Sequence, residues 1–150
     1  LFRSLRCMYN WNTAALLESV LGKAPTAKEA DKKNYEPQRQ AVVNFLERVY
    51  HELQNLGTSP QDRAINYAAT NALNVAHIFA EALKGNMQLD TIEVQRSAVC
   101  RMDSDCWDVL LCFFDPEKQL VRARKCYRFT IDVSDVCPVM VGAVRSWYVR

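Results

Sequence analysis

The cysteines carry the most reactive side chains of this sequence. There are six of them, with no C-x-x-C pair: Cys7, Cys100, Cys106, Cys112, Cys126 and Cys137. Cys100 and Cys106 bracket a polar loop, which can turn two thiolates toward one zinc ion, with a further ligand from a neighbouring strand or another subunit. The same pair can form a disulfide or remain as free, partly buried thiols. Zinc motifs usually contain cysteines that are closer together in the sequence, so free thiols are the favoured state. If a metal is bound, Cys100 and Cys106 are the candidate ligands.

The sequence contains no complete motif for catalysis or nucleotide binding. Its four glycines are too scattered for a P-loop or a dinucleotide fingerprint. No G-x-S-x-G or H-E-x-x-H is present. Both histidines lie in predicted helices: His51 is expected on a solvated surface, and His77 is expected to pair with Glu81 one turn later. A ligand or acid–base role of His77 is the alternative. We therefore predict no catalytic and no cofactor-binding residue.

Two polar stretches of the C-terminal half are candidates for binding. Successive side chains of a strand point to opposite faces of the sheet. This alternation, or parity, places four polar residues on one face of the predicted strands: Asp108, Arg128, Thr130 and Asp132. That face suits peptide binding or is an ordinary solvated face with a cross-strand ion pair. The basic stretch 122–125 is typical of a solvated edge strand, and an acidic partner is the alternative.

Length and composition predict one globular domain and exclude several classes of protein. The chain has 150 residues, of which 49% are hydrophobic and 24% charged. Its net charge of +2 is too small to predict nucleic-acid binding. No apolar run approaches the ~20 residues of a membrane span. Because no export signal is present, we expect a cytoplasmic protein with reduced thiols. The missing initial Met suggests a fragment of a longer protein.

Hydrophobic spacing predicts three helices in the first half of the chain. One lies within residues 1–21, with Asn12 or Thr13 as its cap, a second runs from about Pro37 to Leu56, and a third covers about 60–84. Ser59 and Pro60 form a start signal for the third helix. The intervening segment 23–37 is polar and predicts a flexible linker.

After Gly85 the hydrophobic period changes from 3.6 to 2. Apolar and polar residues alternate around Ile92, across 106–113 and across 126–133, and a last strand is predicted at about 139–149. Helices followed by antiparallel strands predict an α+β fold, with N-terminal helices packed on a small antiparallel β-sheet. The predicted division is an N-terminal helix or extension over 1–22, a flexible linker over 23–37 and one domain over 38–150.

Several short motifs resemble a known family. The matching stretches are Arg63–Ala72, Ser104–Val109, Phe113–Pro116, Tyr127–Val136, Pro138–Val139 and Val144–Val149. Together they are similar to the C-terminal domain of unknown function of the cyanobactin (patellamide) maturation proteases of the PatG/PatA type, and most similar to that of PatG. The resemblance covers about residues 38–150. Cys126 and Cys137 depart from the apolar residues expected at their positions.

The resemblance implies a role outside the catalytic domain of a larger protein. Parents of this type are subtilisin-like proteases or macrocyclases of ribosomal cyclic-peptide biosynthesis, and this domain supplies none of their triad. We therefore expect a non-catalytic accessory domain that supports peptide or partner binding or self-association as a homodimer. Expected partners are the rest of the parent protease, the precursor peptide and pathway enzymes, with no nucleic acid and no membrane. The alternatives are a metal-binding domain with its own activity and a purely structural module.

Overall fold

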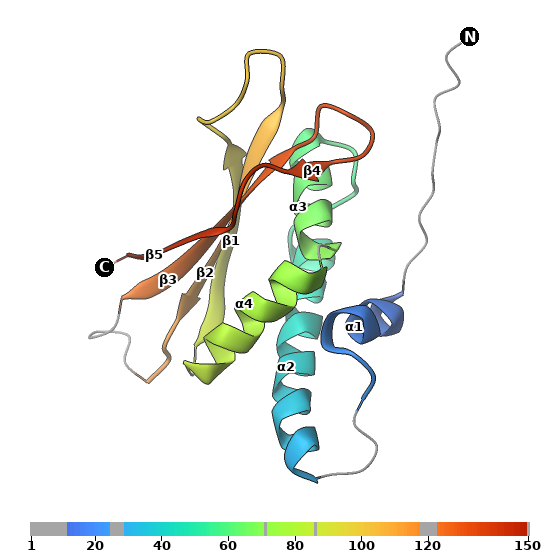
Figure 1. Cartoon of the computed structure of the whole chain (residues 1–150), viewed down its shortest axis with the longest axis vertical. Helices are drawn as coiled ribbons and strands as arrows, with labels where there is room; N and C mark the ends of the chain where they lie inside the picture. The colour runs from blue at the N-terminus through green and yellow to red at the C-terminus, as the bar shows by residue number, and fades with distance from the viewer. Residues whose placement is uncertain (1–11, 25–28, 71, 86, 118–122, 150) are drawn as a thin grey trace.

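Helices come first along the chain and an antiparallel sheet follows, which confirms the α+β prediction (Figure 1). The computed structural model describes residues 12–24, 29–70, 72–85, 87–117 and 123–149. The helices are α1 (Thr13–Leu21), α2 (Glu29–Glu47), the π-helical segment η1 (Arg48–Glu52), α3 (Pro60–Thr70) and α4 (Ala72–Lys84). The strands are β1 (Gln88–Arg96), β2 (Cys106–Phe114), β3 (Arg124–Asp132), β4 (Val139–Met140) and β5 (Arg145–Val149). None of the described helices has the length and apolarity needed to cross a membrane.

The five strands form one sheet, in which β1, β2 and β3 are consecutive neighbours. The far edge of β3 is shared by two short strands. β4 places Met140 opposite Ile131, and β5 places Trp147 opposite Cys126. The single strand predicted over 139–149 is therefore divided in two. The chain turns between them at Gly142, whose φ of 77° glycine adopts without a steric penalty.

The core lies between the helices and one face of the sheet. The residues of β2 and β3 that parity assigned to this face are buried there, among them Val109, Leu111, Phe113, Tyr127, Phe129 and Ile131. Four aromatic rings cross the core, from Phe45 (α2) through Phe79 (α4) and Phe113 (β2) to Tyr127 (β3). Successive ring centroids are 5.3, 5.5 and 5.8 Å apart, in tilted or edge-on contact. We call these four rings the aromatic row, because they join the helices to the middle of the sheet.

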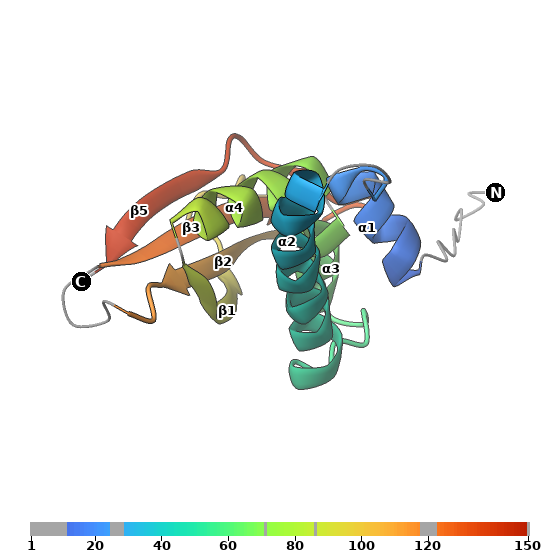
Figure 2. The same ribbon diagram turned by 90° about the horizontal axis from the view of Figure 1, so that it is seen from below.

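α2 begins earlier than the hydrophobic pattern predicts. The pattern places a linker over 23–37 and a helix from about Pro37, whereas α2 begins at Glu29 and contains Pro37. The linker prediction is therefore wrong from Glu29 onward, and residues 25–28 lie outside the described residues. Glu, Ala and Lys prevail before Pro37 and favour a helix by intrinsic propensity, although they supply no apolar stripe. Figure 2, like Figure 1, shows α1 beside α2, and these two helices are in contact.

The end of this helix also differs from the prediction. The N–H of Leu53 donates to the carbonyl of Arg48, five residues earlier, at 3.1 Å. The chain then turns at Gln54, which has a φ of 48°. As a result Leu53 and Leu56, which helical spacing assigned to the core, are 46% and 81% exposed.

The helix predicted over 60–84 is two helices, α3 and α4, on either side of residue 71. At the end of α3 the Thr70 hydroxyl donates to the carbonyl of Asn66 at 2.8 Å, a contact that bends helices. The predicted start is confirmed as a capping box. The Asp62 N–H donates to Ser59 Oγ at 3.1 Å, and the Ser59 N–H donates to Asp62 Oδ2 at 3.3 Å.

Cys112 of β2 and Cys126 of β3 form a disulfide. They lie directly opposite each other in the strand register, with Cα atoms 4.1 Å apart, on the sheet face away from the aromatic row. The expectation of reduced, free thiols is therefore wrong for this pair. The physical reason is the register, which brings together two residues that are 14 positions apart in the sequence.

We predict that Phe79→Ala lowers the free energy of unfolding by about 3–5 kcal/mol, because it removes one of the two inner rings of the aromatic row and leaves a cavity. Urea unfolding followed by circular dichroism measures the change. Leu56→Ala is the matched control, and this exposed substitution should cost less than about 0.5 kcal/mol. Similar losses in the two variants would contradict the packing described above.

The double variant Cys112→Ala/Cys126→Ala should lose about 3 kcal/mol of stability, since the disulfide closes a loop of roughly 15 residues in the unfolded chain. Unfolding of the unmodified chain with and without a reductant measures the same contribution. Cys137→Ala, at an exposed free cysteine, serves as the control. A midpoint that the reductant leaves unchanged would show that the bond is not part of the native protein.

Candidate functional site

The sheet has a second face, opposite the aromatic row, with charged and aromatic side chains. We call it the open face and define it by the even-numbered residues of β2 and β3 and the odd-numbered residues of β5, as the strand register places them. Figure 1 shows α1, α2 and α3 to one side of the sheet. The residues that parity assigned to a polar face lie on this open face, as predicted.

Asp108 lies at the centre of the open face and is only 4% exposed. Thr130 Oγ1 donates to its Oδ1 at 2.7 Å, and Arg128 Nη1 lies 3.7 Å from its Oδ2. The same Arg128 guanidinium lies over the Trp147 ring, 5.8 Å from the centroid. A cross-strand ion pair is therefore present, and one chain of contacts links β2, β3 and β5.

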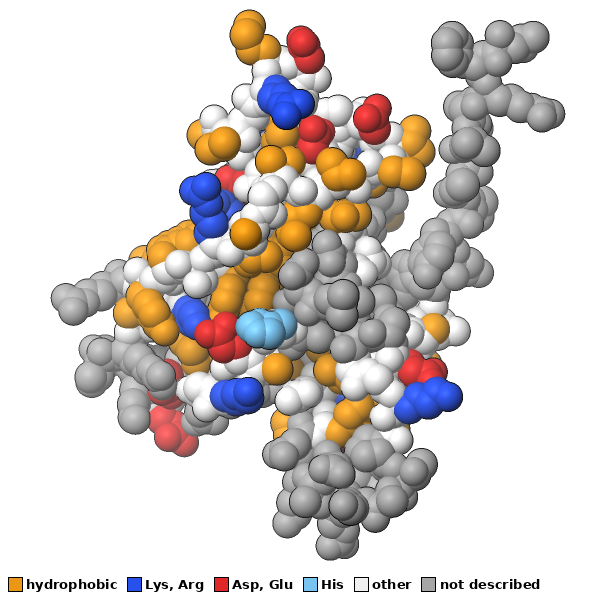
Figure 3. Space-filling view, viewed as in Figure 1, with side chains coloured by type: hydrophobic (Ala, Val, Ile, Leu, Met, Phe, Trp, Pro, Cys, Tyr) orange, Lys and Arg blue, Asp and Glu red, His pale blue; other side chains and the backbone are white. Residues whose placement is uncertain are grey.

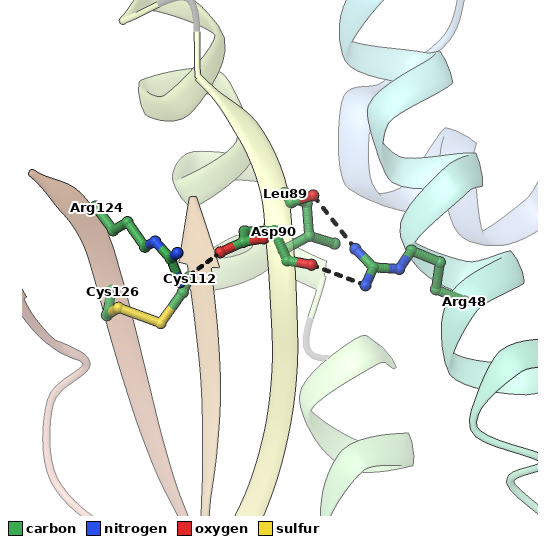
Figure 4. A network of polar contacts seen from close by, with 6 residues as sticks. All are labelled: Arg48, Leu89, Asp90, Cys112, Arg124 and Cys126. Carbon is green, nitrogen blue, oxygen red and sulfur yellow. Dashed lines mark hydrogen bonds and ion pairs between the residues drawn. A yellow bond between two sulfur atoms is a disulfide. The ribbon is translucent and has the colours of Figure 1, made fainter. Parts of the chain in front are cut away.

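The β1 edge of the sheet is held by two arginines (Figure 4). β1 has a bulge between Leu89 and Thr91. Arg48 of η1 donates to the carbonyls of Leu89 and Asp90 at 3.3 and 2.9 Å. Arg124 of β3 reaches past the disulfide to the Asp90 carboxylate at 3.0 Å. A bulge and a bound arginine both prevent a further strand from pairing with this edge.

The opposite edge is formed by β5, and its backbone groups alternate between β3 and the outside. The Val141 N–H donates to the carbonyl of Thr130 at 2.8 Å, so even-numbered residues of β3 direct their backbone toward β4 and β5. Trp147 faces Cys126 in the register and therefore bonds to β3. Ser146 and Tyr148 then direct their N–H and C=O groups outward. Among the described residues, β5 pairs with no strand but β3.

Apolar side chains accompany the β5 edge. Tyr148 and Val149 are 61% and 43% exposed, and Val139 of β4 and Val141, which follows β4, are 54% and 41% exposed. Figure 3 shows hydrophobic side chains reaching the surface on this side of the molecule. The edge therefore combines outward backbone groups with exposed apolar surface.

A cluster of titratable side chains joins α4 to β3. Tyr127 donates its hydroxyl proton to Glu81 Oε2 at 2.8 Å, and the Lys125 ammonium forms an ion pair with Glu81 Oε1. Hydrogen bonds from Lys125 and then Tyr127 lower the pKa of Glu81, and the nearby charge of His77 lowers it further. The hydrogen bond to Glu81 in turn raises the pKa of Lys125. The predicted His77–Glu81 interaction is thus part of a cluster that joins α4 to β3. We call the contacts of Glu81 with Lys125 and Tyr127 the clamp.

Cys100 and Cys106, the candidate metal ligands, lie close together: Cys100 is in the connection between β1 and β2, and Cys106 is the first residue of β2. The exposed Cys100 thiol donates to the carbonyl of Ser104 at 2.9 Å and also contacts the buried Cys106 thiol. Burial, and then the hydrogen bond with Cys100, raise the pKa of Cys106 to about 12, so this thiol is protonated at neutral pH. In the described part of the chain, no three His, Cys, Asp or Glu side chains are placed to hold a metal. Zinc binding stays a prediction, and Cys7 lies outside the described residues.

A cleft of about 430 Å³ opens between α2, α4 and the start of β1. Phe79, Met87 and Phe113 line its apolar part, and Gln40 and Asn44 are among its polar lining. Phe79 and Phe113 also belong to the aromatic row, so the cleft reaches the core. Its size suits a small ligand or a single large side chain.

The family model described as PatG C-terminal matches residues 32–147. The chain belongs to the PatG C-terminal family. A solved structure, "PatG Domain of Unknown Function", has 46% sequence identity to this PatG C-terminal domain and a TM-score of 0.72. The match covers 98% of this chain and 53% of that chain, so the domain spans about half of that chain's length. No curated protein matches. The resemblance found in the sequence is confirmed.

Several residues of the short motifs on which the resemblance rests connect loops of this domain. The Asp105 N–H donates to Ser134 Oγ at 2.7 Å, and Trp107 Nε1 donates to Asp105 Oδ1 at 2.9 Å. Arg63 of α3 donates to the carbonyl of Asp135. These contacts tie the start of β2, the end of β3 and α3 to one another. Much of the sequence signature therefore maintains the fold.

Sequence analysis missed three features of this PatG C-terminal domain: the Arg48 contacts to β1, the clamp around Glu81, and the outward backbone of β5. Parity does place Cys112 and Cys126 on one face, which is a signal for their pairing. The exact partner depends on the strand register. Contacts between η1 and β1, or between α4 and β3, depend on helix placement and leave no local signal.

Glu81→Gln should reduce stability at pH 7 by about 0.5–1 kcal/mol, because it removes the ion pair with Lys125 at a half-exposed site. The contacts of the ionised Glu81 carboxylate lower its pKa in the folded chain. They therefore stabilise the folded chain fully when the pH is above the unfolded-state pKa of about 4.3, and this stabilisation is lost as the pH falls through the pKa of the folded chain. The gap between wild type and variant should therefore shrink in acid.

Thermal unfolding from pH 7 to about pH 3 measures this pH dependence. Glu93→Gln, at an exposed position of β1, is the matched control and should follow the wild type. A gap between wild type and Glu81→Gln that stays constant down to the acid end would contradict the clamp.

Proposed function

We propose that this chain is a non-catalytic accessory domain of a subtilisin-like cyanobactin-maturation protease or macrocyclase. In that setting it supports peptide or partner binding, or self-association, during ribosomal cyclic-peptide biosynthesis. Membership of the PatG C-terminal family supports the setting. The match to about half of a longer solved chain supports its place in a larger protein.

The contrast between the two sheet edges carries the proposal. A free edge readily pairs with another chain, and natural sheets cover, bend or charge their edges to prevent it. β1 is bent by a bulge and bonded by Arg48. β5 has outward backbone groups and exposes Tyr148. A sheet with one protected edge and one bare edge has the geometry of strand-addition recognition.

The polar clusters support a non-catalytic role. Asp108 is engaged by Arg128 and Thr130. Glu81 is engaged by Lys125 and Tyr127. Each cluster joins separate elements of the fold, and each carboxylate already has cationic or hydroxyl partners. These contacts are typical of clusters that stabilise a fold.

A metal-binding domain is the second candidate, and the contact between Cys100 and Cys106 favours it. Two adjacent thiols supply part of a zinc site, and the remaining ligands would come from other chains or other parts of the protein. Native mass spectrometry of the chain purified without chelator distinguishes the candidates. Stoichiometric zinc that Cys100→Ser abolishes would favour the metal-binding candidate.

The test of the proposed function is an assay of the parent protease with and without residues 32–147. We expect the deletion to raise KM for the precursor peptide and to leave kcat unchanged, since a remote binding site contributes equally to the ground state and the transition state. Active-site titration corrects for misfolded enzyme. Unchanged KM and kcat would contradict a binding role and favour a purely structural module.

A further inference from the structure

We propose that the β5 edge binds an extended acidic peptide segment by strand addition. Ser146 and Tyr148 supply the backbone hydrogen bonds, and Arg145 selects the charge. This inference rests on the proposed function, because it names the chemistry of the segment that the accessory domain recognises. It assigns that recognition to one edge of the sheet.

The backbone of β5 provides the docking groups. Trp147 lies opposite Cys126 and bonds to β3, so its neighbours Ser146 and Tyr148 each offer an N–H and a C=O to an added strand. These groups are regularly spaced in a strand of five residues. An extended peptide of similar length can satisfy them all, whereas a helix cannot, because its backbone groups bond internally.

The charges near this edge favour an acidic peptide. Three cations of β3 are already paired with carboxylates on other elements, namely Arg124 with Asp90, Lys125 with Glu81 and Arg128 with Asp108. Arg145 is exposed and lies directly opposite Arg128 in the register. Like charges at opposite positions of neighbouring strands repel each other. A carboxylate beside Arg145 on an added strand would offset this repulsion.

The side chains of β5 predict the pattern of the peptide. Arg145 and Trp147 share the open face, and Trp147 is held there by the Arg128 guanidinium. Tyr148 lies on the other face, where the Lys125 ammonium is 5.7 Å from its ring centroid. Successive residues of an added strand point to alternate faces. The segment should therefore place acidic residues on the Arg145 face and apolar residues against the exposed Tyr148 ring.

A second copy of this chain is the competing occupant of the edge. Pairing β5 with itself would bring together two strands that each carry Arg145 next to Arg128. That arrangement adds like charges across the new interface, whereas an acidic segment neutralises them. The charge distribution therefore favours the acidic peptide over self-pairing.

The experiment measures peptide binding to the whole chain by fluorescence anisotropy at low salt. The probe is a labelled, end-blocked octapeptide that alternates Glu and Val, and its Lys/Val counterpart is the matched control. We expect the Glu/Val probe to bind and the Lys/Val probe not to bind. Arg145→Glu should weaken binding by about tenfold or more. Arg96→Glu, on the protected β1 edge, should leave it unchanged.

Ser146→Pro tests the backbone contact. The Ser146 N–H points away from β3, so proline removes a docking donor without removing a bond of the sheet. We expect a loss of probe binding similar to that of Arg145→Glu. If this variant does not fold by circular dichroism, Arg145→Glu and the weakening of binding by added salt decide the question.

Several results would overturn the inference: no binding of the Glu/Val probe, equal weakening by Arg96→Glu, or a wild-type dimer that Ser146→Pro makes monomeric in sedimentation. The last result would assign the edge to a second copy. Failure of the β5 assignment can be distinguished from failure of the proposed function. If the probe does not bind and deletion of residues 32–147 still raises KM of the parent protease, the accessory role stands and the β5 assignment falls.

Discussion

The aromatic row is the constraint on which the rest of this structure depends. Phe45 and Phe79 bring two helices together, and Phe113 and Tyr127 continue the contact into the two central strands. Because aromatic rings bury large apolar area, this row of rings fixes α2 and α4 on one face of the sheet. It ends at the Tyr127 hydroxyl, which bonds to Glu81 and so returns to α4. β3 is thereby held rigidly in the middle of the fold.

A fixed β3 determines what the other face and the far edge can do. Its outward side chains form the contacts with Asp108 and Trp147, and the disulfide joins it to β2. Along the edge of β3 that faces away from β2, the strands paired within the described residues are the short β4 and β5. The aromatic packing thus lies on one face of the sheet, and the proposed recognition lies at its β5 edge. The chain belongs to the PatG C-terminal family and matches 53% of a longer solved chain.

The sequence predicts those parts of the fold that local chemistry determines. The change of period after Gly85 separates helices from strands, Ser59 marks a helix start, and parity places Phe113 and Tyr127 in the core. The remaining features depend on tertiary contacts. α2 begins at Glu29 although its first turns lack an apolar stripe, and the disulfide follows from a register that no local pattern fixes. The outward backbone of Ser146 likewise follows only from the pairing of β5 with β3.

Residue-resolved amide hydrogen exchange of the free chain is the most direct test of the claim that the β5 edge is open. An open β5 edge predicts fast exchange at Ser146 and Tyr148, whose N–H groups point outward, and slow exchange at Trp147, whose N–H group faces β3. Slow exchange at all three positions would contradict the account, because it would mean that the edge is already paired or covered in the free protein.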